Sequence, residues 1–324
     1  MHVWPAACAE NLTPVLIEAG GKDSLIVDED ADLTNAAEAA LWCGMSNAGQ
    51  TCIGTEGVYV HEKVFDAFIN EITSQAKDLH ASPDGKIGPI TMPSQLDIIK
   101  SHIDDAIAGG ATVILGGADA VGERYVQPTI LTHVPEDSTA ITDETFGPTL
   151  AINPVESMDK AIQLTNATKY GLAGAVFAKK NGVDIARRVR SGMTSVNSVV
   201  AFAGVPALPC GGVGESGFGR IHGPDGLKEF TFAKSITRQR FKPIMQLTSF
   251  ARHQDRRHGR AYDDGPAWRQ EDTEIGQWVV GSAMEAIHQE PSRSAEPTPL
   301  STGRTRHAES QWRMAQCPDS GHVD

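Results

Sequence analysis

The chain has 324 residues, which is enough for a sizeable hydrophobic core and for two domains. Its formal net charge of -13 excludes a typical nucleic-acid-binding protein, and no apolar run approaches the ~20 residues that a membrane span requires. Five irregularly spaced cysteines, without a signal peptide, a Cys-x-x-Cys pair or a His-Glu-x-x-His motif, exclude a secreted disulfide framework and a metal site and favour the cytoplasm.

Strand and helix signals alternate along most of the chain, which is the pattern of an α/β domain. Asp32 stands where it can cap the helix that leads toward Cys52. In chain order, apolar spacing predicts a helix end at 6–11, strands at 15–17 and 24–27, a helix through Leu41, a strand at 56–61, helices at 64–79 and 96–107, a strand at 112–115, a helix at 159–164, a strand at 173–178, a helix at 183–189 and a strand ending at 195–197.

The composition changes near Lys242. Only six of the 74 residues from Ala251 to Asp324 are Ile, Leu, Val or Phe, well under the roughly 20% below which a packed core becomes doubtful. The same stretch has nine Arg and no Lys. We therefore expect residues 251–324 to be a disordered tail, and Cys317 within it to be inert.

Cys52 ends a small, polar, glycine-containing turn that begins at Ser46, surroundings that do not resemble a hydrophobic core. Upstream, Glu18 follows the apolar run 15–17 and enters a glycine turn. A thiolate of mildly lowered pKa is a strong nucleophile, and a carboxylate can serve as a general base. Together they indicate acyl-transfer chemistry on a carbonyl. The alternative for Cys52 is a buried structural cysteine, which is what we expect of Cys8 and Cys43. The alternative for Glu18 is a solvated surface glutamate.

Five stretches resemble, in the same order, motifs of the C-terminal, catalytic part of the aldehyde dehydrogenase superfamily. Each alone is a modest signal, and the ordered set over roughly residues 6–242 is a strong one. The stretches are Asn11–Pro14 leading into Glu18–Lys22, Asn47–Cys52, Tyr125–Leu131, Asp143–Pro148 and Pro209–Arg220.

The resemblance implies a fold, a reaction and a cofactor. The fold is an open, mostly parallel sheet with flanking helices. Cys52 attacks an aldehyde to form a thiohemiacetal, hydride loss to a nicotinamide ring leaves a thioester, and Glu18 activates the water that hydrolyses it. Glu144 and Phe146 hold the nicotinamide ribose and ring, with Gly20 as a further cofactor contact. NAD and NADP both remain open. Without the resemblance, Glu144 would be a surface residue and Phe146 a core residue.

The family's N-terminal segment, which supplies most of the dinucleotide-binding domain, has no counterpart here. We expect residues 1–22 to be a remnant of that domain, 23–220 to form the catalytic domain, and 221–250 to form strands that bridge subunits of a homo-oligomer. An alternative is a catalytically dead, truncated remnant that keeps the catalytic-domain fold and a reactive thiol. A third is a thiol-dependent esterase that uses Cys52 and Glu18 without a cofactor.

Two features bear on the substrate, which the resemblance implies is a small-molecule aldehyde. Cys210 replaces a phenylalanine that is common in the family beside its aldehyde tunnel. Residues 198–208 are small and apolar and contain no cation, which favours an uncharged aldehyde. The glycines at 211–212 and 217–219 do not follow a strand and open a helix, so we expect a turn that shapes the fold rather than a phosphate loop.

Overall fold

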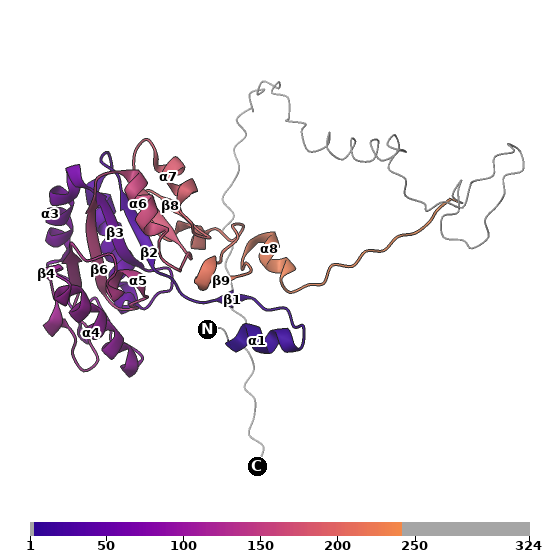
Figure 1. Ribbon diagram of the computed structural model, residues 1–324, viewed down its shortest axis with the longest axis horizontal. Coiled ribbons are helices and arrows are strands. Elements are labelled where there is room, and N and C mark those ends of the chain that lie inside the picture. The colour runs from indigo at the N-terminus through magenta and orange to yellow at the C-terminus, as the bar shows by residue number, and fades with distance from the viewer. Residues whose placement is uncertain (1–2, 242–324) are drawn as a thin grey trace, which may run out of the picture. The chain divides into compact units, whose positions relative to one another are not determined.

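The computed structural model describes residues 3–241, and those up to Thr237 form one compact unit (Figure 1). The predicted tail at 251–324 lies outside the described residues, and so does Cys317. None of the helices within residues 3–241 is long and apolar enough to cross a membrane.

A seven-stranded sheet forms the centre of the unit, with the strand order β4-β5-β6-β3-β2-β7-β8. All neighbouring pairs are parallel except β4 and β5, which are antiparallel. The predicted open, mostly parallel α/β sheet is therefore confirmed. The strands are β2 Asp23–Val27, β3 Thr55–His61, β4 Thr112–Leu115, β5 Thr129–Thr132, β6 Thr149–Val155, β7 Gly174–Phe177 and β8 Ser195–Val196.

Helices cover both faces of this sheet (Figure 1). On one face, α2 packs against α3, and residues of α4 join the same core cluster. On the other face, α6 lies on β2, β3 and β6, while α7 lies on β7 and β8. The helices are α1 Val3–Glu10, α2 Leu33–Met45, α3 Phe65–Ala76, α4 Pro93–Ala108, α5 Thr139–Thr142, α6 Met158–Thr165, α7 Gly182–Arg188 and α8 Gly223–Lys228.

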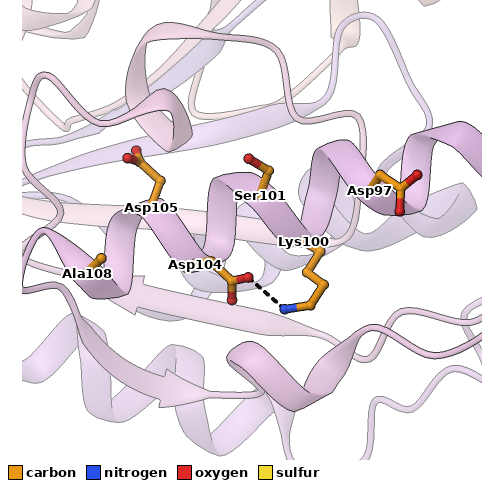
Figure 2. A pocket seen from close by; sticks show the side chains of 6 residues that line it. All are labelled: Asp97, Lys100, Ser101, Asp104, Asp105 and Ala108. Carbon is orange, nitrogen blue, oxygen red and sulfur yellow. Dashed lines mark hydrogen bonds and ion pairs between the residues drawn. The ribbon is translucent and has the colours of Figure 1, made fainter.

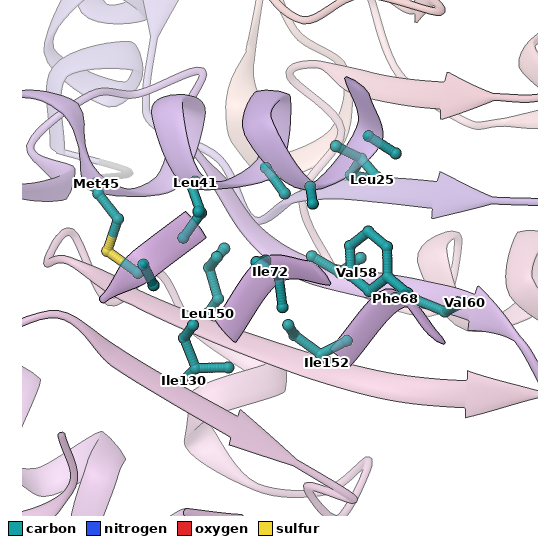
Figure 3. Close-up of a cluster of buried hydrophobic side chains, with 14 of the residues drawn as sticks. Leu25, Leu41, Met45, Val58, Val60, Phe68, Ile72, Ile130, Leu150 and Ile152 are labelled. Carbon is teal, nitrogen blue, oxygen red and sulfur yellow. The ribbon is translucent and has the colours of Figure 1, made fainter. Parts of the chain in front are cut away.

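The alternation of side chains along β2 explains the two layers of the core. Leu25 and Val27 point into the cluster with α2 and α3, where Phe68 and Leu150 are also fully buried (Figure 3). Ile26 points to the opposite face, into the cluster with α6 and α7. Because successive strand residues face opposite sides, a strand that is covered on both faces has consecutive apolar residues, as Leu25, Ile26 and Val27 are.

Helix α2 begins where the sequence predicted. The carboxylate of Asp32 accepts a hydrogen bond from the Asn35 N–H at 3.2 Å and so caps the helix. Alanines Ala36, Ala37 and Ala40 are fully buried and allow α2 to approach the sheet closely. The helix thus starts after the carboxyl end of β2 and carries the chain back to the amino end of β3.

A second, two-stranded sheet pairs β1, Ile17–Glu18, with β9, Gly217–Phe218, in antiparallel orientation. This sheet joins the segment around Glu18 to the segment around Gly217, which lies some 200 residues later in the chain. Residues 221–241, predicted to form strands, contain α8 followed by irregular backbone; residues 242–250 lie outside the described part. The bridging role of 221–250 and the domain boundaries remain predictions.

Candidate active site

The predicted site residues gather at one edge of the sheet. Glu18 and Gly20 precede β2, Cys52 precedes β3, and Glu144 and Phe146 precede β6. Since β2, β3 and β6 are parallel neighbours, their amino ends lie together. Open α/β sheets more often bind ligands beyond the carboxyl ends of their strands, so the location of this site at the amino ends is specific to the fold.

The loop that carries Cys52 is fixed by its own amide side chains. Asn47 and Ala48 both have left-handed backbone conformations, at φ 54° and 59°, which turn the chain sharply after α2. Asn47 Nδ2 donates to Gln50 O at 2.8 Å, and Gln50 Nε2 donates to Asn47 O at 2.9 Å and to Pro89 O at 3.1 Å. The Asn-x-Gly-Gln pattern therefore locks the loop and leaves Cys52 exposed at its end.

Glu18 lies on β1 and is exposed. Partial burial of its carboxyl raises the pKa of Glu18, and the positive charges of Arg220 and His222 oppose this rise. A carboxylate with a raised pKa is a stronger base than an ordinary glutamate, which suits a residue that must take a proton from water. Glu18 is therefore accessible and basic.

Cys52 and Glu18 are close enough for their charges to interact. Desolvation raises the pKa of the Cys52 thiol, and the negative charges of Asp23 and Glu18 raise it further. The backbone N–H groups of Ile53 and Cys52 partly oppose this rise. Cys52 therefore lacks the mildly lowered pKa that favours a thiolate. Its neighbours in the chain do not reveal the cause, because Asp23 comes from β2.

Glu144 stands opposite the glycine turn before β2. Its Oε1 accepts a hydrogen bond from the Gly21 N–H at 3.0 Å, and burial raises the pKa of its carboxyl. A Cβ on Gly20 would lie 2.6 Å from both carboxylate oxygens, so only glycine leaves room for this contact. Phe146 is half-buried in the same loop. One carboxylate oxygen and one partly accessible ring therefore remain for a ligand, which fits a ribose and a nicotinamide.

A buried polar network, which the sequence analysis did not anticipate, holds this loop in place. Lys22 forms an ion pair with Glu56, and Lys22 Nζ also donates to Thr145 Oγ1 at 3.1 Å. The Glu56 carboxylate accepts the N–H groups of Thr145 and Phe146, both at 2.8 Å. His102 Nδ1 lies 3.1 Å from Thr145 Oγ1, and burial together with the Lys22 charge lowers the pKa of His102. A single Lys–Glu pair thus connects β2, β3 and the Glu144–Phe146 loop.

Cys210 lies beside the same site. It packs against the cluster of Leu172, Ala173, Met193 and Phe202, as does Ile53, the neighbour of Cys52. The charges of Glu18 and Cys52 contribute to a raised pKa of the Cys210 thiol, after desolvation. Cys210 is therefore near Cys52.

The glycine-rich stretch after Cys210 packs against protein backbone. Its Gly212-x-Gly214-x-x-Gly217 spacing formally matches a dinucleotide fingerprint, but a 3-10 turn at Gly214–Ser216 leads into β9 rather than into a long helix. A Cβ on Gly217 would lie 2.0 Å from Ile17 O, and φ is +110° there. The stretch therefore shapes the β1–β9 contact.

A shallow hollow of about 520 Å³ lies over α4, away from these residues (Figure 2). Three of its charged side chains already have partners, and the fourth, Asp97, is a lone surface carboxylate among the described residues. Lys100 pairs with Asp104 at 2.6 Å, and Asp105 accepts hydrogen bonds from Ser138 Oγ and from the N–H and hydroxyl of Thr139. The hollow therefore contains no reactive group that would make it an active site.

Comparison with known proteins agrees with this geometry. Residues 1–236 match the aldehyde dehydrogenase family. A "Putative succinate-semialdehyde dehydrogenase" of Mycolicibacterium smegmatis, described as NADP(+)-dependent, is 38% identical over 242 residues, covering 72% of this chain and 47% of the relative. The 4,4'-diapolycopene aldehyde oxidase of Methylomonas sp is 35% identical over 231 residues, covering 70% of this chain and 43% of the relative. The chain spans about half the length of the curated relatives it matches.

Solved structures give the same result. An NAD-dependent aldehyde dehydrogenase from Sinorhizobium meliloti has a TM-score of 0.70 at 30% identity, covering 75% of this chain and 50% of that one. Betaine aldehyde dehydrogenase from Staphylococcus aureus, solved with NAD+, has a TM-score of 0.65 at 31% identity, and the match covers 71% of this chain and 47% of that one. With the family match over most of the chain and the motifs assembled at one edge of the sheet, the chain belongs to the aldehyde dehydrogenase family.

Proposed function

We propose that this chain supplies the catalytic half-site of an NAD(P)-dependent aldehyde dehydrogenase, with Cys52 as nucleophile and Glu18 as general base. The observation that carries the proposal is that an exposed thiol and an exposed carboxylate, on separate elements at one edge of the sheet, are near enough for the Glu18 charge to influence Cys52. Fixed positioning of a nucleophile and a base removes much of the entropic barrier to reaction.

The chemistry follows from these two groups. The Cys52 sulfur forms a bond to the aldehyde carbon, and the carbonyl oxygen gains a proton to give a thiohemiacetal. Oxidation of that carbon would leave a thioester on Cys52: a bound nicotinamide would supply the hydride acceptor, and the hydroxyl proton would pass to solvent. Glu18 then takes a proton from a water molecule whose oxygen attacks the thioester, and the sulfur departs as the carboxylic acid forms. The raised pKa of Glu18 supports its role in the last step.

Glu144 and Phe146 are the residues that would hold a nicotinamide cofactor, whose part is to accept the hydride. The Glu144 Oε1 is held by Gly21, and its second oxygen can accept a ribose hydroxyl. Phe146 can pack beside the nicotinamide ring, and Gly20 gives the carboxylate its space. An oxidised nicotinamide is cationic, so its presence would oppose the carboxylates that raise the pKa of Cys52. Relatives include both NAD- and NADP-dependent proteins, and both cofactors fit these contacts.

For the substrate we propose a small, uncharged aldehyde. The segment 198–208 brings no cation toward the site, and Val205 and Leu208 in it are exposed and apolar. Some relatives are named for charged aldehydes, among them a succinate semialdehyde and betaine aldehyde. A site for a carboxylated aldehyde needs a cation to balance the buried charge.

The test is NAD(P)H formation by the chain with an aliphatic aldehyde and with succinic semialdehyde, for both cofactors. Turnover that is lost in Cys52→Ala, kept in Cys43→Ala, and faster with the aliphatic aldehyde supports the proposal. Faster turnover of succinic semialdehyde would contradict the substrate class. Turnover that survives Cys52→Ala would contradict the mechanism.

The competing function is a non-catalytic protein that keeps the catalytic-domain fold and a reactive thiol. It predicts that iodoacetamide labels Cys52 while no NAD(P)H forms with any aldehyde. The esterase alternative predicts hydrolysis of p-nitrophenyl acetate that needs Cys52 and Glu18 and does not respond to added NAD(P).

A further inference from the structure

Asp23 is a buried acid beside the nucleophile, and the mechanism above does not use it. It is the first residue of β2, and only 4% of its surface is exposed. Its Oδ1 accepts a hydrogen bond from the Ala173 N–H at 2.9 Å, at the amino end of β7. Its Oδ2 is buried and forms no hydrogen bond within the described residues. The carboxyl group therefore has half of its hydrogen-bonding capacity unfilled.

Asp23 and the Cys52 loop meet across Gly21. A Cβ on Gly21 would lie 2.8 Å from Asp23 Oδ1 and 3.0 Å from the Cys52 carbonyl oxygen. Glycine at this position thus allows the acid and the nucleophile loop to approach each other. The negative charge of Asp23 raises the pKa of the Cys52 thiol, and after desolvation it is the largest cause of that rise.

The charged groups around Asp23 all disfavour its ionised form. Glu56 approaches from β3 and Glu144 from the loop before β6, and both carry negative charge. Lys22 is adjacent in the chain, but its ammonium group pairs with Glu56 and Thr145. In the part of the chain that the structure describes, no cation forms an ion pair with Asp23. Burial and these carboxylates raise the pKa of Asp23 to about 8, against which the Ala173 N–H has only a partial effect.

We propose that Asp23 is a positioning residue that tunes the nucleophile: its buried carboxyl is neutral near neutral pH, and once it ionises in alkaline solution its charge opposes the Cys52 thiolate. Two acidic groups whose charges interact titrate as a pair, with one negative charge accepted more readily than two. The reactivity of Cys52 is then unaffected by Asp23 near neutral pH and limited by it in alkaline solution. This inference rests on the proposed function in one respect only, namely that Cys52 is a reactive thiol.

The test measures the thiol and not turnover, so its failure is distinguishable from that of the proposed dehydrogenase. Iodoacetamide alkylation of Cys52 is followed by mass spectrometry as a function of pH in the wild type, in Asp23→Asn and in Asp28→Asn. Asp28 is the matched control, because it is also a buried aspartate but follows the opposite end of β2.

The proposal predicts equal rates for wild type and Asp23→Asn near about pH 6.5, and a rate on the order of ten-fold higher for Asp23→Asn near about pH 9, as a unit charge removed from nearby would give at intermediate dielectric. Asp28→Asn should follow the wild type. Superimposed profiles for Asp23→Asn and wild type would overturn the proposal. A ratio that is the same at every pH would also overturn it, since a general structural effect has no pH dependence.

The wild type provides a readout that does not depend on whether a variant folds. If Asp23 and Cys52 influence each other's ionisation, the plot of the wild-type alkylation rate against pH must rise over a wider range than a single ionisation gives. It must also show a shoulder near the pKa of Asp23, about 8. A profile that fits a single thiol ionisation overturns the proposal even if no variant can be purified.

Discussion

The backbone of Gly49 lies directly against the carbonyl group of Gly147, so the loop that carries Cys52 and the loop that carries Glu144 and Phe146 are packed backbone to backbone. A Cβ on Gly49 would lie 2.1 Å from Gly147 O, and φ at Gly49 is +71°. Two residues that are distant in sequence therefore set the spacing between the proposed chemistry at Cys52 and the proposed cofactor site at Glu144.

Gly49→Ala should therefore destabilise the protein and displace Cys52. The added methyl group meets backbone that cannot rotate away, and the positive φ adds strain, so we expect a loss of more than about 1 kcal/mol in the free energy of unfolding. Urea denaturation measures the loss, and iodoacetamide alkylation reports the displacement of Cys52. The control is Gly88→Ala, whose Cβ would meet nothing within 4 Å. Equal stability of the two variants would contradict the backbone contact.

The Lys22–Glu56 pair should be strongly coupled. Both side chains are buried, and Glu56 also accepts the backbone N–H groups of Thr145 and Phe146. Removal of one partner leaves an uncompensated buried charge, so Lys22→Met and Glu56→Gln should each lose about 3–5 kcal/mol of stability. The double variant should lose much less than both losses together. Additive losses in a double-mutant cycle by urea denaturation would show that the pair does not act as a unit.

Asp23 should make the protein less stable as pH rises. The folded state holds its proton up to a pKa of about 8, whereas the ordinary value is 3.8. Between these values the unfolded chain binds fewer protons than the folded chain, so stability falls with increasing pH. Each pKa unit corresponds to about 1.4 kcal/mol, so the difference between wild type and Asp23→Asn should change by a few kcal/mol over this window. Denaturation midpoints at several pH values measure it, and a constant difference would contradict the burial of a neutral acid.

Glu18 should set the acidic limit of thioester hydrolysis. Its pKa lies above the ordinary 4.5 and is held down by Arg220 and His222. The base form is lost as pH falls through that pKa, so the rate of p-nitrophenyl acetate turnover should fall there. Arg220→Met removes an opposing charge and should move this limb to higher pH, while Arg220→Lys keeps the charge and should leave it in place. If the rate falls at the same acidic pH in Arg220→Met and in Arg220→Lys, the ionisation that causes the fall does not belong to Glu18.

The sequence analysis predicted those helices and strands whose start, end or pattern is set by residues adjacent in the chain. The cap at Asp32, the apolar run of β2 and the helix expected at 96–107 each depend on neighbouring residues, and each is present in the structure. Strands β5 and β6 were not predicted, and β6 contains Pro154, which lacks the N–H group that a central strand normally uses. The structure accommodates it near the end of the strand, where it pairs with Val60.

The candidate site was predictable where a motif marked it. Cys52, Glu18 and Glu144 lie in stretches that resemble family motifs, and the sheet brings their elements to one edge. Asp23 and Glu56 were missed, since each is an ordinary acid in sequence and becomes unusual only through burial. A regularity in spacing was available: Lys22 and Glu56 are 34 residues apart, as are Glu18 and Cys52, because both pairs span the same two parallel strands.

The central claim is that Cys52 forms an acyl intermediate that Glu18 resolves. The most direct measurement is mass spectrometry of the chain after brief exposure to p-nitrophenyl acetate, in wild type and in Glu18→Gln, with the acetyl group located by peptide mapping. The account predicts acetyl on Cys52, transient in the wild type and accumulating in Glu18→Gln. Acetyl on Cys43 or Cys210 with none on Cys52, or an acetyl-Cys52 that is cleared equally fast in both proteins, would contradict it.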